Sequence, residues 1–499
     1  MRLALKAYSM RWLAVDQIRR SCYRPLHARC VAYSGVGNLD LEPPAENRWR
    51  MERNEFIVAR AGRFLNDRFL PALQYSDYRK LWYASMCSQS SAWALIVARG
   101  ALAKSLTGSD LWTGLVTFAA MIPSVLISPL AGYLADRFDR RAVMLWSFGV
   151  NLAHNLLLAF LVVFGAIEAW HLVLLAVMNG SARSIQMPAA SALLANTIPP
   201  ERLFNGVALQ SATLQGSRFL GPLVMLVMLW VTDPWLDDNQ SYVFFLSVLL
   251  YVMAVGFTLR IRTASRGVVG EGSGMGVIAR DSLKGLSYMY RHPLLLSIIL
   301  LVVAHCAMVM SFESLFPAVA VDKLGMNPES EVLSGFGILM VAFGFPALLT
   351  SMALAGVTSD RIRGRLFLWT GVLSGITPIA LAYSPNLPLA ILAVAGMGAS
   401  QSGFMLIGGG MLQAIAPDAI RGRLMSVYSW HILGFMASFN LINGTLASID
   451  GITASLVLGV GGILFVATMA FSFIRHPLRS LYGRGIPAEA CVVRAPAAD

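Results

Sequence analysis

The chain has 499 residues, of which 56% are hydrophobic and 13% are charged, and its mean hydropathy is +0.63. A soluble domain typically has about 25% charged residues, so this composition excludes a soluble globular protein and indicates one that folds in the lipid bilayer. The formal net charge is +12, but the basic residues are scattered over short polar segments. That distribution is typical of membrane topology and argues against nucleic acid as a partner.

The first fifty residues are rich in arginine, lack hydrophobic periodicity and contain no apolar segment long enough for a signal peptide. We expect residues 1–66 to form a poorly structured basic extension. Alternatively, Met51 is the translation start, and the residues before it are never translated.

Twelve apolar stretches follow, and each is close to the roughly 20 residues that a membrane-spanning helix needs. The sequence therefore predicts an all-α membrane protein with twelve transmembrane helices. Because the first six and the last six stretches have similar total lengths, we expect two pseudo-symmetric six-helix bundles, at 67–260 and 293–475. The predicted spans are 81–106, 111–134, 142–166, 171–197, 204–231, 241–260, 294–317, 331–355, 366–383, 388–415, 423–449 and 452–474.

One short pattern, G-x3-D-R-x3-R, occurs twice, each time in a polar break between two apolar stretches. Equivalent residues of the two copies are 224 positions apart, as the glycines 132 and 356 show. A repeat at matching places in two halves indicates an internal duplication, and duplicated helical membrane proteins are commonly transporters. The fixed residues are Gly132, Asp136, Arg137 and Arg141 in the first copy and Gly356, Asp360, Arg361 and Arg365 in the second.

Arginines are concentrated in alternate loops between the predicted spans. Because basic loops stay in the cytoplasm, we expect a multi-pass protein of the cytoplasmic (inner) membrane with both termini cytoplasmic. The segment 261–292 is then a cytoplasmic linker, and Leu286, Met289 and Tyr290 give its second part the pattern of an amphipathic helix on the membrane face. Residues 476–499 form a cytoplasmic tail.

Three arginines lie inside predicted spans: Arg99 in the first, Arg183 in the fourth and Arg218 in the fifth. Each costs roughly 2.5–3.5 kcal/mol if it faces lipid, so we expect all three to face a central cavity. There they attract a substrate with anionic or oxygen-rich groups. In the alternative interpretation they fix helix packing through polar neighbours, and Arg99 extends with Lys104 to the membrane interface.

Polar residues of the second half face this positive charge. Glu313 and His305 lie in the seventh predicted span and Gln401 in the tenth. A desolvated glutamate and a histidine can both titrate near neutral pH, so we predict that Glu313 and His305 couple transport to protons and that Gln401 contributes to substrate binding. The alternatives are a packing role for His305 and an ion pair with an arginine for Glu313.

Several segments resemble the major facilitator superfamily, and more narrowly its branch of enterobactin-type siderophore exporters and related drug exporters, the transmembrane secretion effectors. The resemblance covers about residues 75–475 and implies that the first, fourth, seventh and tenth spans surround the cavity. Beside the duplicated loop pattern, it rests on the segments 106–109 (LTGS), 128–131 (SPLA), 285–293 (GLSYMYRHP), 416–418 (APD) and 421–426 (RGRLMS).

The resemblance also implies a role for the duplicated aspartates. Asp136 would cap the positive N-terminal end of the eleventh span near Arg423, and by symmetry Asp360 would cap the fifth span near Phe204, while the cytoplasmic side is closed. We call this arrangement the latch; it would hold the two halves together and release them when the cavity opens inward. Alternatively, both loops serve only as basic topology anchors.

Two features depart from proton antiporters of this kind. Met225 and Leu226 occupy the positions of a glycine pair that commonly follows the fifth span's Gly-Pro, and Gln186 stands where many relatives have an acid. Because of these departures, the sequence is compatible with import as well as with export.

Other classes of protein are excluded by what the sequence lacks. There is no Gly-Lys-Ser/Thr phosphate loop of an ATP-driven pump, and neither histidines nor cysteines show catalytic or metal-ligand spacing. We therefore predict no enzyme, no cofactor and no metal. The chain is expected to be a monomeric, proton-coupled secondary transporter that exports a small amphipathic or anionic molecule, siderophore-like or drug-like. The alternatives are an importer of a small metabolite or siderophore and a membrane sensor or scaffold that does not transport.

Overall fold

In the computed structural model the described part of the chain is helical throughout and contains no strand. The basic extension 1–66, most of the Gly/Ser-rich linker and the end of the tail lie outside the described residues. Those described are 71–232, 242–263, 265, 286–323, 325–327, 331–355, 357, 359–417, 421–474 and 476–485.

The first group of helices runs from residue 71 to residue 259. Local signals set several ends: α3 stops at Gly108, which has a φ of 65°, and the side chain of Asp139 caps α5 by accepting the Ala142 N–H at 3.0 Å. The elements are η1 (Pro71–Gln74), α3 (Ser76–Thr107), α4 (Asp110–Arg137), α5 (Arg140–Val163), α6 (Ala169–Thr197), η2 (Pro200–Arg202), α7 (Leu203–Thr232) and α8 (Tyr242–Leu259).

The second group follows the linker, whose last residues, 286–291, are helical. Its elements are α10 (Pro293–His305), the π-helical turn η3 (Cys306–Met310), α11 (Phe316–Ala318), the π-helical turn η4 (Val319–Lys323), α12 (Val332–Ala355), α13 (Asp360–Ala382), α14 (Leu387–Ile415), α15 (Arg421–Ala447), α16 (Ala454–Ile474) and α17 (His476–Arg484).

The predicted seventh span differs most from its expectation. Instead of one helix over 294–317, the chain forms α10 and η3, leaves helical geometry over residues 311–315, and resumes as α11. The break contains Ser311, Glu313 and Ser314, whose polar side chains compete with the backbone for hydrogen bonds. An apolar count over this stretch cannot detect such a break.

Within the described residues, nine segments are long and apolar enough to cross a membrane. The predicted spans at α3, α6 and α15 do not qualify, although these helices contain 32, 29 and 27 residues. At 1.5 Å per residue each exceeds the roughly 30 Å of a bilayer core. Their hydropathy is low because they carry interior polar residues, such as Arg99, Arg183 and Asn440.

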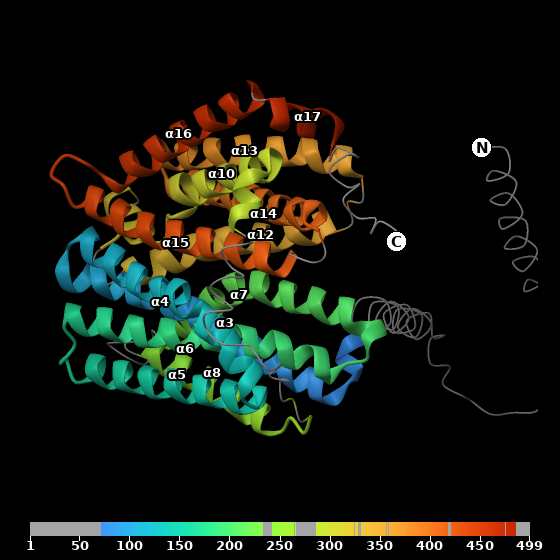
Figure 1. The fold of residues 1–499 in the computed structure, drawn as a ribbon. Coiled ribbons are helices and arrows are strands. Elements are labelled where there is room, and N and C mark those ends of the chain that lie inside the picture. The colour runs from blue at the N-terminus through green and yellow to red at the C-terminus, as the bar shows by residue number, and fades with distance from the viewer. Residues whose placement is uncertain are drawn as a thin grey trace, which may run out of the picture. The chain divides into compact units, whose positions relative to one another are not determined.

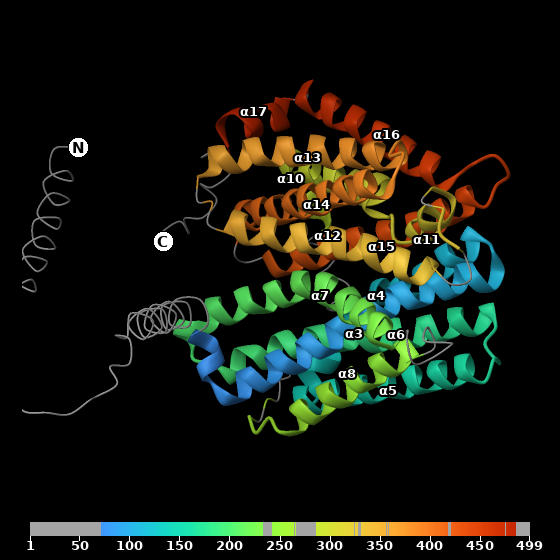
Figure 2. The ribbon, with the colours of Figure 1, turned by 180° about the vertical axis from the view of Figure 1, so that it is seen from behind.

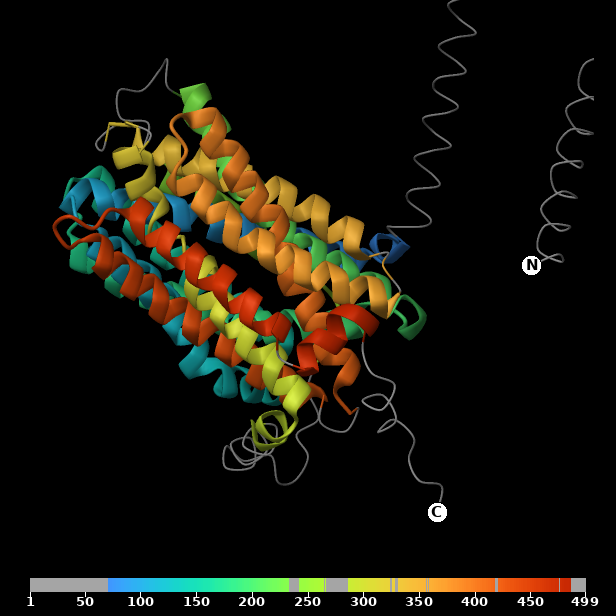
Figure 3. The ribbon, with the colours of Figure 1, turned by 90° about the horizontal axis from the view of Figure 1, so that it is seen from above.

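Helices α3–α8 pack against one another, and so do α10–α17 (Figures 1 and 2). The two groups meet mainly where α4 packs on α15 and α7 on α12, with further contacts between α3 and α12. The long helices run side by side in one general direction (Figure 3). Glycines bring the groups close: a Cβ on Gly114 of α4 would lie 3.1 Å from the Cα of Gly444 of α15, and one on Gly344 of α12 would lie 2.8 Å from the Arg218 carbonyl carbon.

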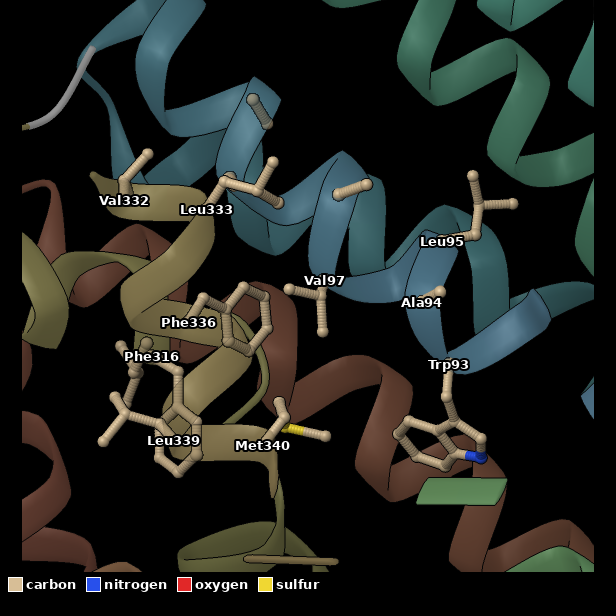
Figure 4. Packing of buried hydrophobic residues seen from close by; sticks show 14 of the residues in the cluster. Trp93, Ala94, Leu95, Val97, Phe316, Val332, Leu333, Phe336, Leu339 and Met340 are labelled. Carbon is tan, nitrogen blue, oxygen red and sulfur yellow. The ribbon is translucent and has the colours of Figure 1, made fainter. Parts of the chain in front are cut away.

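We call the end of the bundle that carries the two duplicated loops the motif end, and the opposite end the far end. At the far end a single apolar core joins both groups. It contains Trp93 and Val97 of α3 together with Phe336 and Met340 of α12, and Figure 4 shows these side chains meeting across the contact between the groups. A Cβ on Gly100 would lie only 2.9 Å from the Phe336 ring, so the packing leaves no room there.

At the motif end the apolar core divides in two. One core belongs to the first group and includes Tyr78, Phe148 and Leu193. The other belongs to the second group and includes Phe367 and Phe404. The two groups are therefore joined by apolar packing at the far end, whereas each has its own core at the motif end.

Candidate functional site

Two polar pairs join α6 to α3 near the middle of both helices. Arg183 donates from Nη2 to the Gln89 Oε1 at 2.9 Å, and Gln186 donates to the Ser88 hydroxyl at 3.0 Å. Residues 183 and 186 share a helix face because they are three positions apart. Arg183 and Gln186 therefore both contact α3.

Arg218 lies where α7 meets α12. Its guanidinium carbon is 4.7 Å from the centroid of the Trp93 ring of α3, a distance at which a cation is attracted to an indole face. Its Nε atom is buried and has no hydrogen-bond partner among the described residues. Arg218 therefore retains hydrogen-bonding capacity beside the boundary between the two groups.

Glu313 lies in the break between η3 and α11 and is 3% exposed. Its Oε2 accepts a hydrogen bond from Asn440 of α15 at 3.2 Å. The positive charges of Arg218 and Arg183, from the first group, act on this carboxylate. No ion pair within 4 Å joins it to either arginine in the described part of the chain. One buried acid of the second group thus lies within electrostatic reach of two basic side chains of the first.

Side chains of α14 and α15 bond the backbone that the break exposes. Asn440 accepts the Ser314 N–H at 3.1 Å, and Asn443 donates to the Ser311 carbonyl at 2.7 Å. Gln401, predicted to bind substrate, donates to the Val309 carbonyl at 2.9 Å. Unwound backbone in a membrane protein is found only where such partners or a cavity satisfy it.

Arg99 is 2% exposed and lies inside the first group. It donates to Asn179 of α6 at 3.3 Å, and Asn179 donates to Asn151 of α5 at 2.6 Å. Nε and Nη1 of Arg99 are buried without a partner among the described residues. This interior position fits the packing alternative and not extension to the interface, whereas Lys104 pairs with Asp110 at 2.7 Å.

His305 is fully buried in the core of the second group. Its ring centroid lies 4.6 Å from that of Phe404 and 5.1 Å from that of Phe465. Neither ring nitrogen has a hydrogen-bond partner in the part of the chain that the structure describes. The structure therefore packs the His305 ring against aromatic rings.

The first copy of the duplicated loop joins α4 to α5. Gly132 and Asp136 lie near the end of α4, and the side chain of Asp136 is outside the described part. Arg137 is exposed. Arg141 donates to the Thr258 carbonyl at 3.2 Å and the Leu259 carbonyl at 2.6 Å, so it compensates the negative C-terminal end of α8.

In the second copy, Gly356 lies outside the described residues, and Asp360 is the first residue of α13. The carboxylate of Asp360 pairs with Arg363 on the same helix at 3.1 Å, and both side chains are substantially exposed. Arg361 and Arg365 are exposed as well. In this conformation, then, the hydrogen bond found for Asp360 is to its own helix. The side chains of Phe204 and Arg423, near which the latch was predicted, are not described.

The polar residues that hold the charged ones in place were not among the predicted site residues. Asn440 and Asn443 are amides in an otherwise apolar span, and Gln89 lies in a serine-rich part of the first span. Uncharged amides are tolerated in membrane helices at modest cost, whereas charged residues there are rare. The amides therefore did not stand out in the sequence as the arginines did. Amides spaced three apart within the eleventh span were the available signal.

A helical bundle of two packed groups, with polar and charged residues at the boundary between them, is typical of helical membrane transporters. A family profile described as a transmembrane secretion effector matches residues 69–482, and the chain belongs to this family. Its members are transport proteins, so the chain is not an enzyme.

Two curated relatives illustrate the similarity. An uncharacterized MFS-type transporter of Mycobacterium tuberculosis is 27% identical over 319 residues, covering 61% of this chain and 69% of the relative. The multidrug efflux pump Tap of Mycolicibacterium fortuitum is 22% identical over 359 residues, covering 69% of this chain and 83% of the pump. The chain is thus similar to a drug exporter over most of its described length.

Solved structures share the fold. The nucleoside transporter NupG matches with a TM-score of 0.60 and 15% identity, covering 80% of this chain and 98% of that one. The xylose transporter XylE from E. coli, in an inward open conformation, matches with a TM-score of 0.59 and 14% identity, covering 79% and 96%. At this identity the similarity concerns the fold alone.

Proposed function

We propose that the protein is a secondary active exporter that moves a small amphipathic or anionic molecule across the cytoplasmic membrane by alternating access, coupled to protons. The observation that carries this proposal is the buried Glu313 of one group, held by Asn440 in a broken helix and close enough to Arg218 and Arg183 of the other group for their positive charges to act on it. Opposite charges on two bodies that move against each other can exchange a proton or an anion between them.

The proposal includes the topology predicted from the sequence. The nine apolar segments together with the long helices α3, α6 and α15 make twelve spans, six on each side of the linker. With the arginine-rich loops in the cytoplasm, the motif end is the cytoplasmic end and both termini are cytoplasmic. A single monomer then contains the complete pathway.

The division of the cores supports alternating access. Apolar packing joins the groups at the far end, and separate cores at the motif end let the groups part there without exposing either one. We assign this conformation to the state closed toward the outside. Asp136 and Asp360 act as the latch in the opposite state, and the pairing of Asp360 with Arg363 is the released arrangement.

Arg218 and Arg183 are proposed to bind anionic or oxygen-rich groups of the substrate, because each guanidinium is near the boundary and has donors beyond its present partners. Glu313 is proposed as the proton-coupling group. His305 is left out, because neither of its ring nitrogens has a hydrogen-bond partner among the described residues. Arg99 and Gln401 support the helices that carry the site.

Export is favoured over import by the similarity to the efflux pump Tap. Import of a small metabolite or siderophore is the second candidate, since alternating access runs in the direction that the gradients set. A membrane sensor that does not transport would keep this fold yet show no flux.

The test uses the purified full-length protein in liposomes, with an imposed pH step and two fluorescent probes, an amphipathic anion and the cation ethidium. We expect pH-driven flux of the anion, lost in Glu313→Gln. Arg218→Gln should reduce anion flux by about tenfold, corresponding to about 1.4 kcal/mol, and ethidium flux much less. Full response of Glu313→Gln to the pH step would refute the coupling role.

A second variant separates the latch from the charge site. The Asp136→Asn variant should insert and fold, but its transport of either probe should be severely reduced. The state closed toward the cytoplasm would lose the helix cap that Asp136 provides, an interaction worth about 0.3–2 kcal/mol. Wild-type flux in that variant would reduce the loop to a topology anchor. Flux of neither probe in the wild-type protein, in either direction, would favour the sensor alternative.

A further inference from the structure

The helix α17 lies against the start of α13, where the second copy of the duplicated loop ends. It packs on α13, α16 and α10 (Figure 1). Leu478, Leu481 and Tyr482 share one face of this nine-residue helix, because they are three and four positions apart. All three are buried and belong to the core of the second group. α17 is therefore a packed part of this group.

Tyr482 joins α17 to two neighbouring helices. Its hydroxyl group shares a hydrogen bond of 2.7 Å with the Ser472 hydroxyl of α16. Its ring is nearly parallel to that of Phe473 of α16, with 6.4 Å between the ring centroids, and lies at the same distance from the Phe367 ring of α13. A buried tyrosine with a partner for its hydroxyl group and aromatic neighbours for its ring has a defined orientation. These contacts fix α17 on both helices.

Glycines let the backbone of α17 touch the first turns of α13. A Cβ on Gly364 of α13 would collide with the Leu481 carbonyl group, whose carbon would be 3.1 Å away. Gly485, directly after α17, has a φ of 84°, and its N–H donates to the Leu481 carbonyl at 2.9 Å. A Cβ on Gly485 would lie 2.7 Å from the Asp360 carbonyl carbon and 2.8 Å from the Arg361 nitrogen. The end of α17 thus rests on the peptide group that joins these two residues.

The first half of the chain has a counterpart of this contact. The residue equivalent to Gly364, 224 positions earlier, is Arg140. The Arg140 N–H donates to the Ser265 carbonyl at 2.9 Å, and its guanidinium donates to the Ser265 hydroxyl at 3.2 Å. Ser265 belongs to the segment that follows α8, as α17 follows α16. In both groups, then, the segment after the last long helix packs on a copy of the duplicated loop.

The contact with α17 restrains Asp360, the residue that the latch uses. Its backbone lies against the end of α17. The carboxylate is outside this contact, because it is substantially exposed and pairs with Arg363 at 3.1 Å. α17 therefore holds the backbone of Asp360 and leaves the side chain free to change its partner. That combination suits a group that must reach another helix from a fixed starting point.

We propose that α17 positions Asp360 for the latch. It holds the first turn of α13 so that the carboxylate reaches the start of α7 when the cytoplasmic side closes. Gly364, Tyr482 and Gly485 are then positioning residues that act through Asp360. This inference rests on the latch of the proposed function. It does not depend on the substrate, the direction of transport or the coupling ion.

The test is a double-mutant cycle, measured as flux of the amphipathic anion into liposomes that contain the full-length protein. Gly485→Ala places a methyl group against the peptide after Asp360, at a φ that alanine rarely adopts. We expect this variant to reduce flux by about tenfold, as Asp360→Asn does, within the range for loss of one interaction between a charge and a helix end. In the Asp360→Asn background, Gly485→Ala should reduce flux no further, because both changes remove the same interaction.

Gly483→Ala is the matched control. Gly483 also lies in α17, but a Cβ there would meet nothing within 4 Å, so its flux should equal that of wild type. A second measurement is independent of flux. Amide hydrogen exchange in peptides from the first two turns of α13 should be faster in Gly485→Ala than in wild type and unchanged in Gly483→Ala.

Three results would overturn the proposal. Equal loss of flux from Gly485→Ala in wild type and in Asp360→Asn would mean that α17 only stabilises the fold, with the latch intact. Wild-type flux in Asp360→Asn would remove the latch itself, and with it any positioning role. Unchanged hydrogen exchange in Gly485→Ala would show that α17 does not restrain α13. If Gly485→Ala fails to insert, Gly364→Ala replaces it in both measurements, since its methyl group meets the Leu481 carbonyl from the side of α13.

Discussion

At the scale of single residues, Asn440 joins α15 to the broken seventh span. Its amide accepts the Ser314 N–H, donates to Glu313 at 3.2 Å and donates to the Met436 carbonyl at 3.0 Å. It thereby fixes both the exposed backbone and the orientation of the carboxylate. An unpaired buried donor costs about 1–3 kcal/mol, so this residue stabilises a conformation that the backbone would not keep alone.

Asn440→Ala should therefore destabilise the protein by about 1–3 kcal/mol, because the buried Ser314 N–H loses its acceptor. The measurement is the apparent melting temperature of the purified protein in detergent. Asn443→Ala is the control, since its partner is a part-buried carbonyl, and carbonyls tolerate loss of one bond better. Equal melting temperatures for Asn440→Ala and wild type would contradict the assignment.

Asp77 links the start of α3 to the segment after α8. Partial burial raises its pKa, but hydrogen bonds from Lys80, the Thr263 hydroxyl and the N–H groups of Arg262 and Thr263 outweigh this and lower the pKa to about 2. A folded-state pKa below the ordinary 3.8 means that the ionised form stabilises the folded state. The contribution is complete above that ordinary value and is lost as the pH falls toward 2.

The melting temperature of the wild-type protein should therefore fall further between pH 6 and pH 3 than that of Asp77→Asn, since the variant has no carboxyl group at this position to protonate. Asp450→Asn, at an exposed acid in the loop between α15 and α16, should keep the wild-type difference. Identical pH differences in wild type and Asp77→Asn would show that this carboxylate does not stabilise the fold.

At the scale of helices, close contact between the two groups depends on glycine. On Gly114 a Cβ would be 2.8 Å from the Asn440 carbonyl oxygen, a distance that packed side chains do not adopt. On Gly149 of α5 a Cβ would meet nothing within 4 Å. A change from glycine to alanine is thus sterically hindered at position 114 and unhindered at position 149.

Gly114→Ala should lower both the melting temperature and the transport rate. The added methyl group would push α4 and α15 apart at the far end and so disturb their packing. Gly149→Ala, the matched control, should be neutral or stabilising by about 0.5–1 kcal/mol, since alanine favours a helix. A stabilised Gly114→Ala variant would show that the two helices are not held at this distance in solution.

At the scale of the whole molecule, one core joins the groups at the far end and two cores separate them at the motif end. Movement of one group against the other then requires the α7–α12 contact to change. Gln215 of α7 and Ser351 of α12 share a hydrogen bond of 3.2 Å across it. This pair reports directly on relative movement.

With the five native cysteines replaced, Gln215→Cys and Ser351→Cys joined by a short, reducible thiol cross-linker should stop transport, and reduction should restore it. The initial flux of either probe into liposomes is the measurement. Gln215→Cys alone, treated with the same reagent, is the control. Wild-type flux in the cross-linked protein would mean that transport proceeds without movement at this contact.

Much of this molecule follows from its sequence. The bilayer as solvent requires long apolar helices, and the ends of α4, α5, α12 and α14 lie within a few residues of the predicted spans. The duplicated loops indicated a transporter, and the segments around 106–109 and 285–293 indicated its branch, as the family match over residues 69–482 confirms. Arg99, Arg183 and Arg218 were found because charge in a membrane span is rare.

What the tertiary structure decided is which of these charges meet. From the sequence we expected Arg99, Arg183 and Arg218 on one side of a cavity and Glu313, His305 and Gln401 on the other, without knowing which of them make contact. Packing buries His305 between aromatic rings and connects Arg99 to Asn179. It joins Glu313 to Asn440, where the positive charges of Arg218 and Arg183 act on the carboxylate. Hydropathy indicates whether a segment prefers lipid. Which side chains make contact, however, depends on how each helix is rotated about its axis and on the break at residues 311–315. Only contacts between residues far apart in the chain fix these two features.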